Sequence, residues 1–200
     1  MANVHLCRCH ERDDQGARIG NGLSEWQIAE LINDAARAVL WSTKHWVVVL
    51  QKTLAERITG VNSFVRIATK HSVAVETHCN RFDDPDRSGH FAMVWKASQD
   101  SRLLGKCLLE QMDRERPDAM NHGLCLCDAE RHWIDTHKEY PGKKKGFLFD
   151  VKCPSVIFEC CHLSNPDDAE WIKDATNQRK VGRAVGRGII RYLDLKGVGR

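Results

Sequence analysis

The chain has 200 residues, of which 42% are hydrophobic, and a formal net charge of +3 at pH 7. This length is enough for one sizeable core and short for two independent domains, so we expect a single domain over residues 1–200. The apolar runs are too short to span a bilayer, and the N-terminus lacks a charged segment followed by an apolar one, so we expect no export signal. The slight net charge argues neither for nor against a polyanionic partner, and we expect no nucleic-acid partner.

Strands and helices are predicted to alternate along the chain. Period-two and period-3.6 apolar patterns, with turn and cap residues between them, define the elements. In chain order they are a strand at Val4–Cys9, a helix from the N-cap Ser24 to Leu40, a strand at His45–Leu50, a helix over Leu54–Ala68, strands at Ser72–Thr77 and Phe91–Trp95, a helix carrying Leu103–Leu108, a short strand near Leu124, a strand at Ser155–Glu159, a helix starting at Asn165-Pro166, and a helix from about Asn177 to Leu195.

The segment from Arg116 to Gly146 contains Pro, Gly and a lysine run, so we expect a long surface excursion there. Elsewhere the alternation predicts an α/β fold, a mostly parallel twisted sheet with helices on both faces. In such a sheet, functional residues lie at the carboxyl ends of the strands. The candidate site should therefore be sought just after each apolar run.

Four residues occupy such positions. His10, His78 and Glu159 lie at or just beyond predicted strand ends, and Glu25 begins the helix after the first strand. Two histidines and a glutamate can hold a catalytic zinc ion and leave one position for water. Glu159 ends a buried strand, where desolvation tends to raise a carboxyl pKa, so it is the candidate general acid and base. The alternatives are, for His10 and His78, surface or hydrogen-bonded histidines and, for Glu25, a first-turn acid favoured by the helix dipole.

Several motifs together resemble a known family. The segment Thr77-His78-Cys79-Asn80 resembles the Ser-Ile-His-x-Asn segment of the zinc amidases of the N-acetylmuramoyl-L-alanine amidase 3 family. Pro154-Ser155-Val156-Ile157-Phe158-Glu159 followed by Leu163-Ser164-Asn165-Pro166 resembles that family's Pro-x-Val-Leu-Val-Glu-x-Gly-Phe-x-Ser-Asn-Pro signature. Gly22-Leu23-Ser24-Glu25 resembles its Gly-x-x-Glu ligand, and His10 stands at the place of its Gly-His-Gly histidine.

The resemblance covers nearly the whole chain and implies a function. It implies one zinc ion held by His10, Glu25 and His78, with Glu159 as the catalytic acid and base, and we expect Asn80 to contact the substrate. The implied reaction is hydrolysis of the amide between N-acetylmuramic acid and L-alanine, so the implied partner is peptidoglycan. The chain departs from the family where Cys and Glu replace the glycines beside His10, and where Cys160-Cys161-His162 replaces a small residue, Gly and Phe.

No appended wall-binding repeat is evident, so residues 1–200 are expected to form one catalytic domain. This one-domain organisation, together with the expected lack of an export signal, is similar to that of a small phage or prophage endolysin. Such a protein stays in the cytoplasm of the producing cell and lyses the cell wall after the membrane is permeabilised. Two alternatives remain: a zinc carboxypeptidase or peptidase of similar architecture, and a catalytically inactive protein that binds the wall.

Two further patterns have both structural and functional interpretations. The residues Arg179, Arg183, Arg187 and Arg191 recur every four positions, so they form a cationic stripe on the last helix. This stripe is either a solvated face or, with Lys143 to Lys145, a contact for anionic wall polymer or a membrane surface. The chain has nine cysteines, and this odd number fits buried thiols in a reducing compartment better than a disulfide framework. Their spacings do not match structural zinc knuckles, and a cysteine peptidase is retained as an alternative.

Overall fold

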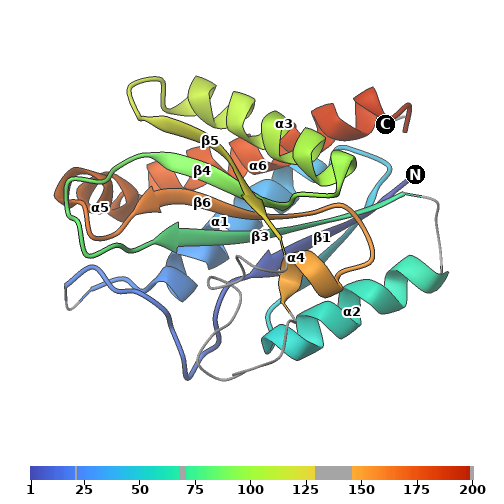
Figure 1. Cartoon of the computed structure of the whole chain (residues 1–200), viewed down its shortest axis with the longest axis horizontal. Helices are drawn as coiled ribbons and strands as arrows, with labels where there is room; N and C mark the ends of the chain where they lie inside the picture. The colour runs from blue at the N-terminus through green and yellow to red at the C-terminus, as the bar shows by residue number, and fades with distance from the viewer. Residues whose placement is uncertain (21, 68–70, 129–145, 199–200) are drawn as a thin grey trace.

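The computed structural model describes residues 1–20, 22–67, 71–128 and 146–198, and six strands within them form one sheet (Figure 1). The strands are β1 (Asn3–Arg8), β2 (Trp46–Leu50), β3 (Ser72–Asn80), β4 (His90–Trp95), β5 (Asn121–Cys127) and β6 (Ser155–His162). Their order is β2-β1-β3-β6-β4-β5. The first four in this order are mutually parallel, whereas β4 runs antiparallel to β6 and parallel to β5. The prediction of a mostly parallel sheet is confirmed.

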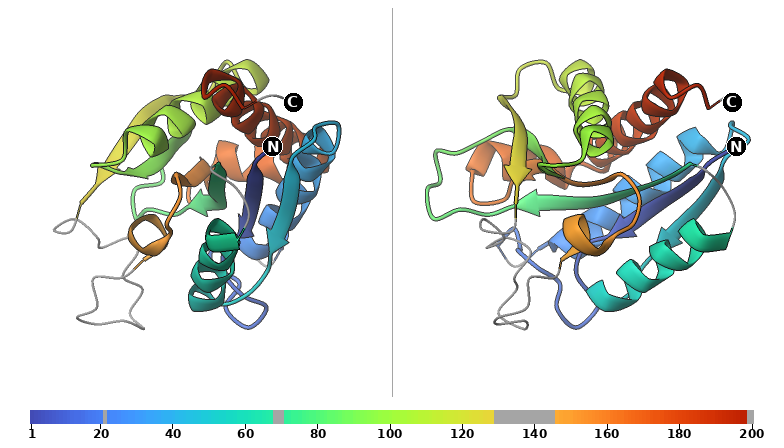
Figure 2. Two further views of the ribbon diagram at one scale, coloured as in Figure 1. Left: turned by 90° about the vertical axis from the view of Figure 1, so that its right-hand side faces the viewer. Right: turned by 45° about the vertical axis from the view of Figure 1, so that its right-hand side comes forward.

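Helices cover both faces of the sheet, as predicted (Figure 2). Those in the described residues are α1 (Glu25–Leu40), α2 (Leu54–Ile67), α3 (Gln99–Glu115), α4 (Phe147–Asp150), α5 (Pro166–Lys173) and α6 (Ala175–Leu195). The larger part of the core lies between the sheet and α1, α3 and α6, and the smaller part lies against α2 and α4. None of the helices in the described part of the chain has the length and apolar character needed to cross a membrane.

Local sequence explains where the helices begin. Ser24 caps α1 in a capping box with Gln27, and Asn165 caps α5 ahead of Pro166, both as predicted. The helices α1 and α6 pack closely because α6 carries glycine at the contact. A Cβ on Gly182 would lie 2.4 Å from the carbonyl oxygen of Ile32, so only glycine permits this approach.

The structure differs from the predicted elements mainly in the extent of β3 and β6 and in the presence of α4. The strands β3 and β6 continue past Thr77 and Glu159, so the candidate residues lie within the strands near their ends. The short helix α4 was not predicted. The strand near Leu124 is confirmed as β5, while most of the expected excursion, including Lys143 to Lys145, lies outside the described residues.

Candidate active site

Three neighbouring parallel strands bring the predicted residues to one edge of the sheet. The strands β1, β3 and β6 lie side by side and run in the same direction. His10 follows the end of β1, and His78 on β3 is paired in register with Glu159 on β6. Glu25 starts α1, and its carboxylate reaches the same edge. The structure thus brings His10, Glu25 and His78 together and places Glu159 beside His78 in the strand pairing, while the roles of the four residues stay a prediction.

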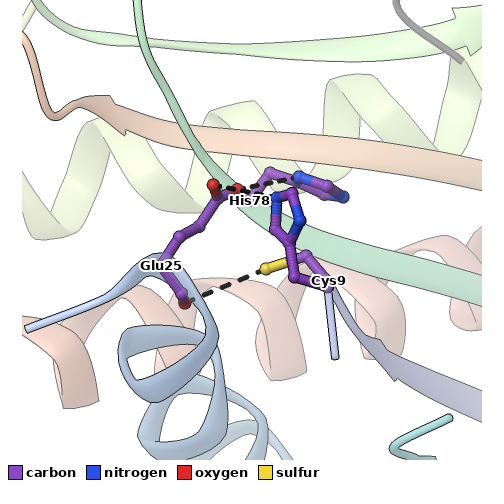
Figure 3. A group of neighbouring side chains, drawn as sticks. Cys9, Glu25 and His78 are labelled. Carbon is purple, nitrogen blue, oxygen red and sulfur yellow. Dashed lines mark hydrogen bonds and ion pairs between the residues drawn. The ribbon is translucent and has the colours of Figure 1, made fainter. Parts of the chain in front are cut away.

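The carboxylate of Glu25 is the centre of this group. Its Oε2 lies 3.0 Å from His10 Nε2, and its Oε1 lies 2.8 Å from His78 Nδ1. Figure 3 shows Glu25 and His78 pointing toward each other, with Cys9 beside them. The backbone N–H groups of Ala17 and Cys79 donate to the same two oxygens. Burial would raise the pKa of Glu25, but the hydrogen bonds from His10 and His78 outweigh it and hold this pKa far below its ordinary value.

The loop after β1 is shaped around the two candidate ligands. His10 adopts a φ of 55°, in the left-handed region that non-glycine residues seldom occupy. Gly16 also has a positive φ, of 69°, and a Cβ there would lie 2.5 Å from the His10 ring and 2.6 Å from Glu25 Oε2. A side chain at position 16 would therefore displace both groups. Strained backbone of this kind persists where the surrounding structure fixes it, often at functional sites.

A buried ion pair supports the histidines from the α2 side. Arg57 on α2 is paired with Glu76 on β3 at 2.7 Å, and both residues are buried. Glu76 Oε2 lies 3.6 Å from His78 Nε2, the ring nitrogen that faces away from Glu25. The guanidinium of Arg57 also donates to the backbone carbonyl of His10. The pair thus contacts both candidate histidine ligands: Glu76 contacts the ring of His78, and Arg57 contacts the backbone of His10.

Opposing effects set the pKa of these inner groups. Burial lowers the pKa of His78, but its hydrogen bonds to Glu25 and Glu76 outweigh this and raise the pKa well above its ordinary value. Burial raises the pKa of Glu76, but the charge of Arg57 and the contact with His78 outweigh this and lower it. Without a metal ion, a positively charged His78 therefore lies between two carboxylates.

Glu159 differs from Glu25 and Glu76 because, among the described residues, no donor to its Oε2 compensates for its burial. It is 5% exposed, and its Oε2 has no hydrogen-bond partner among the described residues. Burial, reinforced by the negative charge of Glu25 and opposed by His78, raises the pKa of Glu159 to about 8. This carboxyl group can therefore hold or accept a proton near neutral pH, as a general acid and base must.

The donor set fits a zinc ion. One ligand atom each from Cys9, His10, Glu25 and His78 lies within 4.8 Å of all the others. Two imidazoles and a carboxylate on separate elements match an open catalytic zinc site. Carboxylates also face the outer ring nitrogens, at 3.6 Å for His78 and at 4.0 Å for His10, where the acid is Asp14. The buried thiol of Cys9 instead donates to the backbone carbonyl of Glu25, at 3.8 Å, so His10, Glu25 and His78 are the candidate ligands.

A cavity adjoins the carboxyl group of Glu159. It has a volume of about 250 Å³ and is lined by Asn80, Arg81, Phe82, Asp83, Phe91, Met93 and Glu159. A second cavity of about 530 Å³ shares Phe82 and Phe91 with it and extends to Arg87, His122 and His162. Asn80, the predicted substrate contact, therefore lines the same cavity as Glu159. The aromatic walls offer an apolar surface, and the arginines offer donors for carboxylates.

Sequence reasoning missed Glu76, Arg57 and Gly16. A signal for Glu76 was present, since an acid inside the apolar run Ser72–Thr77 needs a buried partner. Its spacing of two from His78 also places both on the same face of β3. The contacts of Arg57 and Gly16 with the site depend on the folded path of α2 and of the loop after β1, so sequence spacing gave no signal for them.

The arginine stripe on α6 is largely paired within the molecule. Arg183 and Arg187 both contact Glu115 on α3, at 2.9 and 3.0 Å, and Arg191 contacts Glu110 at 2.9 Å. These ion pairs join α6 to α3 and give the repeating pattern a structural role. Attraction of the stripe to wall polymer or membrane stays a prediction.

Comparison with known proteins agrees with the geometry. The family model described as N-acetylmuramoyl-L-alanine amidase matches residues 4–191. No curated protein matches the sequence. Among solved structures, the fold is similar to an N-acetylmuramoyl-L-alanine amidase from Clostridium difficile 630 (TM-score 0.79, 19% identity, 98% of each chain covered). It is also similar to the catalytic domain of CwlV from Bacillus (Paenibacillus) polymyxa var. colistinus (0.78, 18%, 97% of this chain and 99% of that one). A third is the CwlD amidase from Clostridioides difficile, solved with the GerS lipoprotein (0.75, 23%, 97% and 98%).

Proposed function

The chain belongs to the N-acetylmuramoyl-L-alanine amidase family, and from this premise we propose that it is a zinc-dependent peptidoglycan amidase whose metal ligands are His10, Glu25 and His78. The observation that carries the proposal is the position of Glu25, whose two carboxylate oxygens lie 2.8 and 3.0 Å from one nitrogen of each histidine. A zinc ion held by these groups would polarise the scissile carbonyl and make a bound water more acidic.

In this proposal Glu159 moves the proton. Its carboxylate accepts a proton from the attacking water and returns it to the nitrogen of L-alanine as the carbon–nitrogen bond breaks. The lactyl carboxylate and a free peptide amine are the products. The raised pKa of Glu159, caused first by burial, suits both halves of this exchange because the group can be a base and then an acid near neutral pH. Asn80 and the cavity beside Glu159 are proposed to hold the substrate next to this carboxyl group.

The test is release of stem peptides from purified peptidoglycan, followed by mass spectrometry. The wild type should release peptides with N-terminal L-alanine, and Glu159→Gln and chelated protein should release none. Glu115→Gln, which alters an acid on α3 paired with α6, is the matched control and should remain active. Release of single amino acids would indicate a carboxypeptidase. Binding to the wall without any release, and unchanged in Glu159→Gln, would indicate an inactive wall-binding protein.

We also propose an endolysin-like role, in which the protein stays in the cytoplasm of the producing cell until the membrane is permeabilised. Its support is the burial of the cysteines: seven of the nine are buried, as suits thiols kept in a reducing compartment. Expression in a bacterial host should leave the cells intact until a membrane-permeabilising agent is added, and then lyse them. Lysis without permeabilisation, or none after it, would refute this role.

A further inference from the structure

Three cysteine thiols form a second cluster of metal-ligating groups, separate from the candidate active site. The Sγ atoms of Cys79, Cys160 and Cys161 all lie within 4.8 Å of one another, and those of Cys79 and Cys160 are 3.5 Å apart. All three residues are buried, with exposed fractions of 3%, 0% and 0%. They come from the neighbouring parallel strands β3 and β6.

A β-bulge explains why three thiols meet here. The register pairs His78 with Glu159 and then Asn80 with His162, so β6 uses one residue more than β3 over this interval. In a regular strand, Cys160 and Cys161 would point to opposite faces of the sheet. The extra residue of the bulge lets both of them oppose Cys79.

The thiols lie on the opposite face of the sheet from the catalytic carboxyl group. Cys79, Cys160 and Cys161 belong to the core between the sheet and the helices α1 and α6. Glu159 lines a cavity with Met93, which belongs to the core on the α2 and α4 face. The alternation of side chains along β3 and β6 therefore gives two donor sets, separated by the strand backbone.

The family signature does not account for the thiols. Where the signature has a small residue followed by Gly and Phe, this chain has Cys160-Cys161-His162. The third thiol, Cys79, falls at the variable position of the Ser-Ile-His-x-Asn segment. The cluster is thus a property of this chain beyond the residues that the proposed hydrolysis uses.

We propose that Cys79, Cys160 and Cys161 form a second metal site, which takes one thiophilic ion of the zinc or copper(I) class. Thiolate ligands select such soft ions. Three sulfurs at about 2.3 Å from one ion are separated by about 4 Å, so the ion fits between the thiols with little movement and without a preformed cavity. On binding, each ligating thiol releases its proton to water and a sulfur–metal bond replaces the S–H bond, with no change in oxidation state.

Charge and burial refine the proposal. Net charge in an apolar core is unfavourable. Zinc(II) neutralises more of the negative charge of three thiolates than copper(I) does, so zinc is favoured. Because the thiols are buried, the ion must enter while β3 and β6 pair, and we expect loading to require metal during folding. This site does not depend on the proposed hydrolysis, since none of its ligands is assigned to that reaction.

The test uses the full chain, refolded under reducing conditions with Cd²⁺ as a spectroscopic probe and then freed of excess metal. The wild type should show thiolate-to-cadmium charge-transfer absorption, which imidazole and carboxylate ligands do not give. Cys161→Ala should lose this absorption band. By elemental analysis it should also bind one ion fewer per chain than the wild type. Cys107→Ala, at a buried cysteine outside the cluster, and Cys9→Ala, next to the first site, should keep both.

Absence of the band in the wild type would overturn the proposal. So would a band that persists in Cys161→Ala and disappears in Cys9→Ala, since the thiolate would then belong to the first site. X-ray absorption spectroscopy of the cadmium-loaded wild type needs no variant to fold. Three sulfur neighbours around a bound ion support the proposal, and shells of nitrogen and oxygen alone refute it. Elemental analysis of the protein as isolated identifies the ion. It is the metal, zinc or copper, that the wild type contains and Cys161→Ala lacks.

Discussion

The isosteric substitution Glu159→Gln should stabilise the metal-free protein at alkaline pH while it removes the proposed catalytic proton carrier. Burial raises the pKa of Glu159 from its ordinary value of 4.5 to about 8, so the folded chain disfavours the ionised carboxylate. Each pKa unit corresponds to about 1.4 kcal/mol, so full ionisation reduces the free energy of unfolding by up to about 5 kcal/mol. A neutral amide of the same shape avoids this effect.

The sign of the pH dependence follows from the raised pKa. The folded chain binds a proton that the unfolded chain has released, so this contribution to stability is present below about pH 4.5 and is lost as the pH rises toward 8. The free energy of unfolding of Glu159→Gln minus that of the wild type should therefore be small near pH 5. It should grow by about 1.4 kcal/mol per pH unit and level off above about pH 8.

Urea unfolding at several pH values, in the presence of a chelator, measures this difference. Glu25→Gln is the matched control of opposite sign, because hydrogen bonds from His10 and His78 outweigh burial and lower the pKa of Glu25 in the folded chain. That variant should be less stable than the wild type at neutral pH. A difference between Glu159→Gln and the wild type that stays flat from pH 5 to 9 would show that Glu159 ionises without penalty, and the reasoning would fail.

Three other substitutions test the support around the site and the packing behind it. Glu76→Gln should weaken zinc binding about 10- to 100-fold in a chelator competition, because the outer nitrogen of His78 loses its carboxylate partner, and unchanged affinity would contradict this role. Gly16→Ala should lower amidase activity by about 100-fold or more, since the new Cβ would lie 2.5 Å from the His10 ring; normal turnover would show that the loop adjusts freely. Gly182→Ala should reduce the free energy of unfolding by about 1–3 kcal/mol in urea, because its Cβ would meet a backbone carbonyl of α1 at 2.4 Å, and activity per folded molecule should not change.

Much of the fold and site could be predicted because both follow from local patterns and one general rule. Apolar periods and cap residues such as Ser24 define the elements. The convergence of His10, His78 and Glu159 then follows from the parallel direction of β1, β3 and β6, because parallel strands end at the same edge. The residue types at that edge suggested a zinc site with Glu159 as acid and base, and the family resemblance selected these residues, since spacing alone left other histidines open.

The remaining features depend on contacts between residues distant in sequence. The pair of Arg57 with Glu76 forms only once α2 packs on β3, and no local pattern indicates it. The bulge in β6 could not be predicted for a similar reason. The pairing of β6 with β3 decides whether Cys161 follows the two-residue alternation of side chains or breaks it. Sequence spacing therefore favoured buried thiols over a structural zinc site, whereas the structure places Cys79, Cys160 and Cys161 together.

The charges at the sheet edge connect stability with the proposed chemistry. Glu25 and Glu76 each have cationic or hydrogen-bonding partners, which lower their pKa, so they remain ionised and suit fixed roles as a ligand and as a support for His78. Glu159 is equally buried, but its Oε2 lacks a donor within the described residues. A donor placed there would stabilise the carboxylate and lower its pKa, which would weaken it as a base and as an acid near neutral pH. The absence of that hydrogen bond is therefore unfavourable for folding and necessary for a group that must both take and return a proton.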